Sequence, residues 1–369
     1  MAAKQLLSME SAPDLDLTSV SKRFDDHLAV DDVSFVVSPG EFFSILGPSG
    51  CGKTTLVRMI AGFEEPSAGE IRIRGRSVLG VPANRRPCNM VFQSLALFPM
   101  MSVGENIAYG LRCHGVGKAE AAERTRRMLD RVGLPGFADR SVATLSGGQR
   151  QRVAIARCLV LEPTLVLLDE PLGALDLKLR EQMKLELKEI QATFNTSFVY
   201  ITHDQSEALV MSDRVAVMNA GRFEQVGPPR ELYHHPATRF VAGFVGETNQ
   251  WTGEVLAPAF GSAAVRLASG SVIEGMGAVD GHRAASFVRP EAIALATDPA
   301  GLPDLPNRFA GRVSAVLFDG ANSSLLIDAP DLGTPLRAAL PQAGPLAGIS
   351  VGTAVVAGWT PEATRIFPA

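Results

Sequence analysis

The chain has few cysteines, and their spacing matches neither a disulfide-bonded nor a zinc-bound scaffold. Four cysteines occur in 369 residues, at positions 51, 88, 113 and 158. No two of them form a CxxC pair, and no histidines stand near them at zinc-ligand spacing, so we expect neither a disulfide framework nor a structural zinc site. Reduced thiols of this kind are typical of cytosolic proteins.

An excess of basic charge is also absent, and aromatic residues are scarce. The net charge is −4 and aromatic residues make up 6% of the chain. A nucleic-acid-binding protein usually carries a basic face, and an OB-like binding domain also uses stacking aromatics. We therefore expect no nucleic-acid partner.

Long apolar runs are absent as well. No stretch of about 18 consecutive apolar residues occurs, so we expect no membrane-spanning helix. The first residues are polar or small and lack a basic start followed by an apolar core, so residues 1–13 are expected to be a flexible N-terminus rather than a signal peptide. If the protein serves a membrane process, another chain must cross the bilayer.

The remaining sequence predicts two folded domains. Residues 14–240 alternate strand and helix patterns, which favours an α/β domain with a mostly parallel sheet. Residues 241–369 are rich in Gly, Ala and Pro and contain short apolar runs separated by turns, which predicts a small β-barrel. The expected strands are 15–20, 33–37, 41–46, 165–168, 197–202, 214–219, 264–267, 285–288, 311–318, 324–327 and 351–357. The expected helices are 53–60, 119–133, 149–161 and 178–193, the second with an apolar edge formed by Ala121, Ala122, Thr125, Met128, Leu129 and Val132.

A phosphate-binding loop follows the third expected strand. The motif GxxxxGK[ST] is matched by Gly47, Pro48, Ser49, Gly50, Cys51, Gly52, Lys53 and Thr54, with Thr55 next. Glycines let backbone N–H groups face a phosphate, Lys53 supplies a point charge, and Thr54 offers a hydroxyl to Mg²⁺. A chance match occurs in roughly one chain in a hundred, but the strand before and the helix after the loop favour the functional interpretation. ATP and Mg²⁺ are the expected cofactors.

Cys51 lies inside this loop, where it is most simply a small loop residue. We also hypothesise that a thiol reagent would inactivate the protein, because added bulk there would block phosphate, and that ATP would protect against the reagent.

An acidic pair ends the buried strand 165–168. Asp169 is predicted to reach Mg²⁺ directly or through water, and Glu170 to activate the attacking water as a general base. A solvated acidic turn is the alternative interpretation, but the phosphate loop favours the catalytic one.

Residues 145–149 read LSGGQ and are followed by RQRVAIAR. This resembles the signature of the ABC ATPase family, in which Ser146, Gly147, Gly148 and Gln149 would bind the γ-phosphate of ATP held by another copy. The resemblance covers about residues 15–240. It implies a homodimer with each ATP sandwiched between Lys53 of one copy and Ser146 of its partner.

Other positions match the family in order. Phe24 resembles the aromatic residue that stacks on adenine, although a lone phenylalanine is more often a core residue. Gln93 matches a glutamine that meets Mg²⁺ and senses the membrane partner, and Asp176 matches the loop that links the two sites. His203 matches a γ-phosphate contact, although a lone histidine is usually structural. The resemblance thus implies Glu170, His203 and Gln93 as catalytic residues, and Thr54, Gln93 and Asp169 as metal ligands.

The tail is similar to importers that carry a TOBE domain, an OB-like barrel, on the residues FVAGFVGETN (240–249) and FVRPEAI (287–293). The resemblance implies two transmembrane permease subunits, docked near Gln93 and the apolar stretch LALFPMM, a periplasmic or extracellular substrate-binding protein, and a peripheral location on the cytoplasmic face of the inner membrane. The segments VFQSLALFPMMSVGENIAYGLR and GFVGETN look most like the spermidine/putrescine branch.

Three alternatives stay open. Importers of iron(III), sugar, sulfate and other solutes share much of this sequence. A soluble ABC ATPase acting on ribosomes or DNA would usually have two cassettes or a long coiled-coil insertion, which this chain lacks. A regulatory module that has lost hydrolysis would not need Glu170 and His203.

Overall fold

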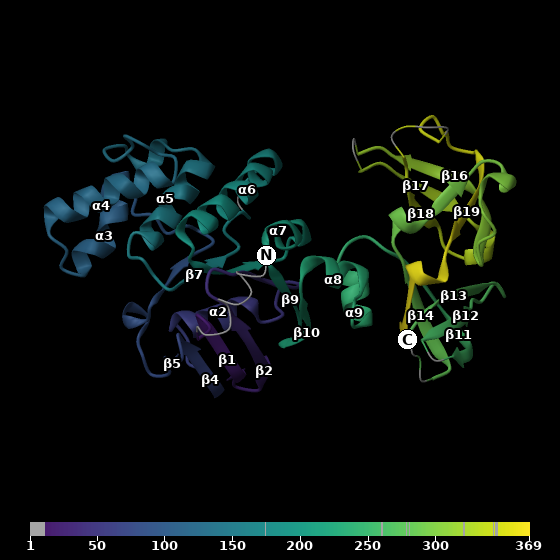
Figure 1. The fold of residues 1–369 in the computed structure, drawn as a ribbon, viewed down its shortest axis with the longest axis horizontal. Coiled ribbons are helices and arrows are strands. Elements are labelled where there is room, and N and C mark those ends of the chain that lie inside the picture. The colour runs from purple at the N-terminus through teal and green to yellow at the C-terminus, as the bar shows by residue number, and fades with distance from the viewer. Residues whose placement is uncertain are drawn as a thin grey trace, which may run out of the picture. The chain divides into compact units, whose positions relative to one another are not determined.

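The computed structural model describes residues 12–173, 175–259, 261–277, 279, 281–319, 322–341, 343 and 346–369. They form two compact units that divide between Leu232 and Tyr233 (Figure 1). Each unit is described separately below.

A six-stranded sheet is the centre of the first unit, with strand order β10-β9-β3-β8-β7-β6. The strands are β3 (Phe42–Leu46), β6 (Cys88–Val91), β7 (Leu165–Asp169), β8 (Ser197–Thr202), β9 (Arg214–Asn219) and β10 (Arg222–Gly227). Every neighbouring pair is parallel except β9 and β10, which are joined by the tight turn Ala220–Gly221, both residues with positive φ. The predicted parallel sheet is confirmed.

A second, antiparallel sheet has the order β2-β1-β4-β5. Its strands are β1 (Leu15–Phe24), β2 (His27–Val37), β4 (Ala68–Ile73) and β5 (Arg76–Ser77). Part of each of the first two strands was expected, residues 15–20 and 33–37, whereas β4 and β5 were not predicted.

Helices cover the parallel sheet. They are α2 (Lys53–Ala61), α3 (Val103–Cys113), α4 (Lys118–Arg131), α5 (Gly147–Leu159), α6 (Leu177–Phe194) and α7 (Gln205–Met211), and α8 (Pro229–His234) follows β10. In Figure 1, α3, α4 and α5 lie side by side as a helical subdomain. The expected apolar edge of α4 is largely correct, but Ala122 is exposed because it lies one residue, about 100° of helix rotation, beyond buried Ala121.

Side-chain alternation along the strands gives the parallel sheet two hydrophobic cores. Val166 and Tyr200 point to the face that packs against α3, α4, α5 and α6. Leu167 and Ile201 point to the opposite face, against α2 and the antiparallel sheet. Since both faces are buried, these strands read as continuous apolar runs rather than alternating ones. The carboxyl ends of β3, β7 and β8 are thereby fixed side by side in one layer.

The second unit starts with α9 (Arg239–Phe244) and is otherwise mainly β-structure. A closed barrel has the order β11-β12-β13-β20-β14, from strands β11 (Asn249–Ala259), β12 (Ser262–Arg266), β13 (Val272–Met276), β14 (Arg283–Val288) and β20 (Thr364–Pro368). A five-stranded sheet has the order β15-β19-β16-β17-β18, from strands β15 (Ala294–Ala296), β16 (Asn307–Leu317), β17 (Ser324–Asp328), β18 (Leu336–Ala339) and β19 (Ala354–Trp359). The stacked indole rings of Trp251 and Trp359, 5.7 Å apart, join both in one core. The all-β prediction is confirmed, and the second sheet adds to the expected barrel.

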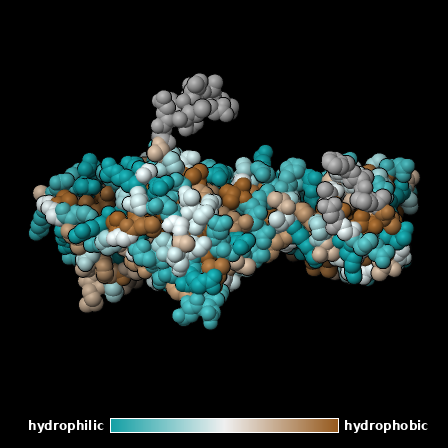
Figure 2. Space-filling view, turned by 90° about the horizontal axis from the view of Figure 1, so that it is seen from below, coloured by the Kyte–Doolittle hydropathy of each residue, from teal (hydrophilic) through white to brown (hydrophobic). Residues whose placement is uncertain are grey.

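Hydrophobic residues on the face drawn in Figure 2 lie in separate patches among hydrophilic ones. Within the part of the chain that the structure describes, no helix has both the length and the apolar character needed to cross a membrane.

Candidate nucleotide site

The loop between β3 and α2 has the backbone of a phosphate cradle. A Cβ atom on Gly47 would lie 2.3 Å from the carbonyl oxygen of Met218, and one on Gly52 would lie 2.3 Å from that of Ala29. Gly52 also has a φ of +107°, which side-chain-bearing residues rarely adopt. Both glycines are therefore required by the path of the loop.

Lys53 and the N-terminus of α2 supply positive charge to this loop. The ammonium group of Lys53 donates to the carbonyl oxygens of Gly47 (2.7 Å) and Pro48 (2.9 Å), and the side chain is buried. Gly52 precedes the helix and offers no side-chain acceptor to its first N–H groups. These unpaired donors and the helix dipole favour an anion at this end of α2.

Asp169, at the end of β7, faces the first turn of α2. The Thr54 hydroxyl donates to its Oδ1 atom at 3.3 Å. Burial raises the pKa of Asp169, an effect that the Thr54 hydrogen bond partly opposes. The described residues contain no cluster of three His, Cys, Asp or Glu side chains that could hold a metal by themselves. A hydroxyl beside one carboxylate instead fits Mg²⁺, which usually takes one or two protein carboxylates and completes its shell with phosphates and water.

Glu170 is held in an unusual backbone conformation next to Asp169. Its φ is +44°, in the left-handed region that non-glycine residues avoid, and its N–H donates to the carbonyl of Ile201 on β8 (3.1 Å). Its Oε1 atom lies 3.1 Å from Nδ1 of His203, which follows β8. Strain of this kind is common where a side chain must be aimed at a reacting group.

These side chains converge on one cavity of about 390 Å³. It is lined by Phe24, His27, Ala29, Ser49, Gly50, Gly52, Lys53, Thr54, Thr55, Gln93, Asp169 and Glu170. The Phe24 ring is 41% exposed, which does not fit a core residue, and Lys22 lies over it at 4.7 Å. His27 and Ala29 were not predicted as site residues; their position on β2, the strand that follows Phe24, was the available signal. Gly47, Pro48, Cys51 and His203 are not among the described lining residues, although His203 contacts Glu170.

The LSGGQ residues are not part of this cavity. Ser146 is exposed and caps α5: its hydroxyl accepts from the Gln149 N–H (3.3 Å), and the Gln149 side chain accepts from the Ser146 N–H (3.0 Å). Gly147 and Gly148 pack against α6 and the residues before it. Asp176 is also exposed and caps α6 through the Leu179 N–H (3.0 Å). A single chain therefore presents the two sets of predicted ligands at separate places.

Comparison with known proteins assigns both units. A model of the ABC transporter family matches residues 30–173, and a TOBE domain model matches residues 287–367. The chain is 52% identical over 323 residues to a spermidine/putrescine import ATP-binding protein, PotA, of Rubrobacter xylanophilus, covering 86% of this chain and 84% of the relative. It is 44% identical over 362 residues to PotA 2 of Pseudomonas aeruginosa, covering 97% and 99%. The chain belongs to the ABC transporter ATP-binding family.

A solved structure agrees with this assignment. CbiO1 from Clostridium perfringens, described as part of the ABC transporter complex cbiONQ, superposes with a TM-score of 0.55 at 29% identity, covering 60% of this chain and 90% of that one. The predicted fold class, an ABC ATPase domain followed by a TOBE domain, is confirmed. The chain is an ABC-type ATPase that binds ATP.

Cys51 turns away from the cavity of this ATPase. Its side chain is 5% exposed and packs in the core beneath the loop. Burial raises the pKa of the thiol, which the nearby Lys53 ammonium partly opposes (Sγ to Nζ, 3.9 Å). The small-loop-residue interpretation explains this packing, and the reactivity hypothesis stays a prediction.

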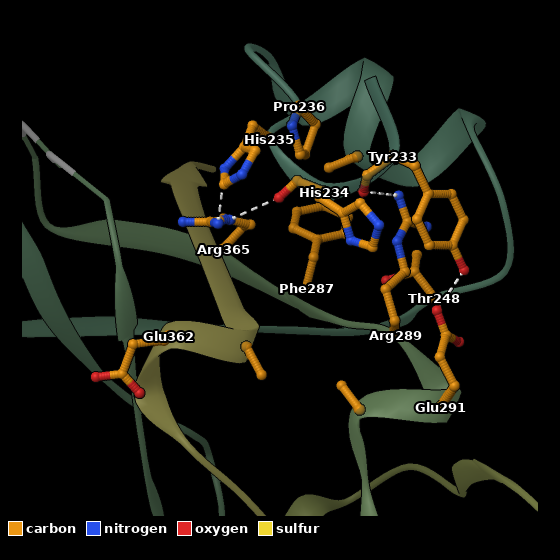
Figure 3. Close-up of a pocket in the computed structure, with 13 residues that line it drawn as sticks. Tyr233, His234, His235, Pro236, Thr248, Phe287, Arg289, Glu291, Glu362 and Arg365 are labelled. Atoms are coloured by element: carbon orange, nitrogen blue, oxygen red, sulfur yellow. Dashed lines mark hydrogen bonds between the residues drawn. The ribbon is translucent and has the colours of Figure 1, made fainter. Parts of the chain in front are cut away.

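The TOBE-containing unit has a cavity of its own, of about 350 Å³ (Figure 3). The Tyr233 hydroxyl donates to Glu291 at 2.5 Å, and burial, followed by Glu291, raises the pKa of Tyr233 to about 12. Arg289 stacks on the Tyr233 ring and donates to backbone carbonyls of Tyr233 and Glu247, while Arg365 donates to that of His234. Arg289 and Arg365 are thus held in place by carbonyl oxygens of the same unit.

Proposed function

We propose that this ATPase energises the import of polyamines, spermidine or putrescine, as the motor of a binding-protein-dependent ABC importer. The observation that carries the proposal is the similarity along nearly the whole chain to relatives named for spermidine/putrescine import, including 97% of this chain in one case. The phosphate cradle and the acidic pair supply the chemistry of the motor. Iron(III), sugar and sulfate remain outcomes of the test rather than second proposals.

The working unit is a homodimer with ATP between the copies. Lys53 and Ser146 belong to different sites on one chain, so each site needs donors from elsewhere. In the dimer, Ser146, Gly147, Gly148 and Gln149 face the γ-phosphate of ATP held by the partner, and Asp176 links the two sites. The N-terminus of α5 suits this role because its dipole favours an anion. ATP binding closes the dimer and hydrolysis reopens it.

Each residue at the nucleotide site has its own role in ATP binding or hydrolysis. Phe24 stacks on the base, Lys53 and the loop N–H groups hold the phosphates, and Glu170 takes a proton from the attacking water. His203, 3.1 Å from Glu170, orients that carboxylate and contacts the γ-phosphate. Thr54, Asp169 and Gln93 fit Mg²⁺, which when bound neutralises charge on the β- and γ-phosphates.

Two permease subunits cross the membrane, and a substrate-binding protein delivers cargo from outside. The ATPase sits on the cytoplasmic face and docks through the stretch after Gln93, where Met100 is 93% exposed and Phe98 is 36% exposed. Exposed apolar side chains at one end of the helical subdomain suit a protein interface. Residues 14–240 form the motor and residues 241–369 the accessory domain; the predicted flexible N-terminus, residues 1–13, lies outside the described residues up to residue 11.

Reconstitution of the chain with its two permease subunits in vesicles tests this function. We expect ATP hydrolysis to rise when spermidine-loaded binding protein is added, and to be lost in Glu170→Gln. Stimulation by another solute alone would overturn the polyamine assignment and leave the motor intact. Failure to associate with membrane subunits would favour a soluble ATPase.

A further inference from the structure

Helix α6 carries a row of basic side chains at four-residue spacing, Arg180, Lys184 and Lys188, that all reach toward α7. The Lys184 ammonium donates to the Ser206 hydroxyl at 2.6 Å, and that of Lys188 donates to the Met211 carbonyl at 2.8 Å. Residues four apart lie on one face of a helix, so a single face of α6 holds α7 along its length.

Arg180 differs from the two lysines because it joins three segments. Its Nη2 donates to the Leu175 carbonyl, directly before Asp176, at 3.1 Å. Its Nη1 donates to Oδ2 of Asp204 at 3.4 Å, and its Nε lies 3.9 Å from Oε1 of Glu207. The planar fork of a guanidinium can span such divergent acceptors, whereas an ammonium is a point charge.

The Arg180 partners fix the segment that carries His203. Asp204 follows His203 and caps α7, accepting from the N–H groups of Ser206 (2.8 Å) and Glu207 (3.2 Å). The Asp204 N–H donates to the Thr202 hydroxyl (2.9 Å), which in turn donates to Glu207 (2.5 Å). His203 is therefore flanked on both sides by residues of one hydrogen-bonded network.

The contacts of Arg180 are longer than a tight ion pair. Charge-assisted N–H···O bonds are usually about 2.7–2.9 Å. The Nε–H group is buried and has no hydrogen-bond partner among the described residues, because Glu207 is too distant. The Glu207 side chain is 4% exposed, so water does not screen this pair strongly. A small displacement of α6 or α7 would change these contacts. The hydrogen bonds of Arg180 are therefore sensitive to the position of residues 175–176, called the Asp176 segment below, whose Leu175 carbonyl accepts from Arg180.

We infer that Arg180 is a positioning residue that ties the Asp176 segment to His203, and through His203 aligns Glu170 for hydrolysis. This rests on the proposed roles of His203, Glu170 and Asp176. Displacement of the segment by the partner copy would move Leu175, Arg180 and Asp204 together. ATP hydrolysis in one site would thereby depend on closure of the dimer around it.

Steady-state ATP hydrolysis by full-length variants tests this. Misplacing a catalytic group by about 1 Å can cost ~100-fold in rate, so we expect Arg180→Ala to lower kcat by ~10- to 100-fold and leave KM for ATP within about twofold. Arg180→Lys should recover part of kcat, because an ammonium reaches fewer of the three acceptors. Lys188→Ala is the matched control: it removes a contact to the far end of α7 and should keep kcat within about twofold of the wild type.

A double-mutant cycle separates positioning from packing. If Arg180 acts through His203, adding Arg180→Ala to His203→Ala should lower kcat no further. Three outcomes would overturn this inference and leave the proposed function intact. Arg180→Ala could keep wild-type kcat and only lower the melting temperature, it could change only KM, or its loss in kcat could add to that of His203→Ala. Full activity of His203→Ala would overturn both the inference and the proposed catalytic site. If Arg180→Ala does not fold, the same comparisons with Arg180→Lys decide the matter.

Discussion

The placement of Glu170 depends on β8: its N–H donates to the Ile201 carbonyl, and its Oε1 lies 3.1 Å from Nδ1 of His203, which follows that strand. The order of the acidic pair after an apolar strand predicted its position at the edge of the sheet. Neither its φ of +44° nor its contact with His203 could be predicted, because both depend on the neighbouring strand β8. His27 and Ala29 were not predicted as site residues for the same reason: the pairing of β1 with β2 brings them to the cavity.

Lys53 is the residue whose loss should affect nucleotide binding most. Lys53→Ala removes the only charged side chain of residues 47–54, together with its hydrogen bonds to the Gly47 and Pro48 carbonyl oxygens. Losing a charge-assisted phosphate contact costs ~2–3 kcal/mol, so ATP affinity should fall by roughly 30- to 150-fold. Titration with a fluorescent ATP analogue measures this. Affinity within a factor of three of the wild type would contradict the cradle.

Cys51 should react slowly, and its reactivity should depend on pH. Because burial raises its pKa, the thiol stays protonated at neutral pH, and the thiolate fraction grows only as pH rises above the ordinary cysteine range. We expect a maleimide to label exposed Cys113 first, and Cys51 only at alkaline pH, with ATP slowing the second reaction and its accompanying inactivation. Peptide mapping by mass spectrometry follows both sites. Rapid labelling of Cys51 at pH 7, or labelling unaffected by ATP, would contradict this account.

At the scale of elements, periodicity and apolar runs predicted helices α2, α4, α5 and α6 and the parallel strands β3, β7, β8 and β9, but not α3, α7 or the parallel strand β6. The expected bounds of β8 and β9 match the structure, and those of α2 and α6 differ by one residue at each end or fewer. β4 and β5 were not predicted because β4 is half exposed, contains Gly69 and pairs with β1, which is distant in sequence, while β5 has two residues. Tertiary pairing, rather than local pattern, decides such strands.

Ser146 caps α5, and substitutions at this position can separate that role from the proposed contact with ATP. Ser146→Ala should remove the cap and destabilise the protein by about 1 kcal/mol. Ser146→Asp should keep the cap, since aspartate is an equally good N-cap residue, but should repel the γ-phosphate. We therefore expect Ser146→Asp to keep its melting temperature and lose ATPase activity. Retained activity in Ser146→Asp, measured beside its thermal unfolding, would mean that α5 does not meet ATP.

For the whole molecule, composition indicated two domains, and the family models fall one in each compact unit. The five-stranded sheet of the second unit could not be predicted, because it pairs distant segments such as β15 with β19 and β16 with β19. Ser146 and Asp176 lie outside the cavity of their own chain, where they cap α5 and α6, so the predicted homodimer stays a proposal that one chain does not test.

The packing of Trp359 against Trp251 should determine whether the second unit keeps its fold. Trp359 is 1% exposed and its indole N–H donates to Thr364 at 3.0 Å. Trp359→Ala should destabilise this unit by about 3–5 kcal/mol, while the six-stranded sheet of the first unit remains folded. Limited proteolysis followed by fragment mapping should show cleavage confined to the second unit. Equal protection of both units would contradict the separate cores.

ATP-dependent dimerisation of Glu170→Gln tests the central claim most directly, because this variant should bind ATP without hydrolysing it. Sedimentation velocity should show a larger species in ATP than in ADP, and adding Ser146→Asp to the same chain should abolish the difference. Such a result would place the LSGGQ residues of one copy on the ATP of the other. If Glu170→Gln binds a fluorescent ATP analogue yet sediments identically in ATP and ADP, or if Ser146→Asp leaves the ATP-dependent species intact, the shared site is wrong.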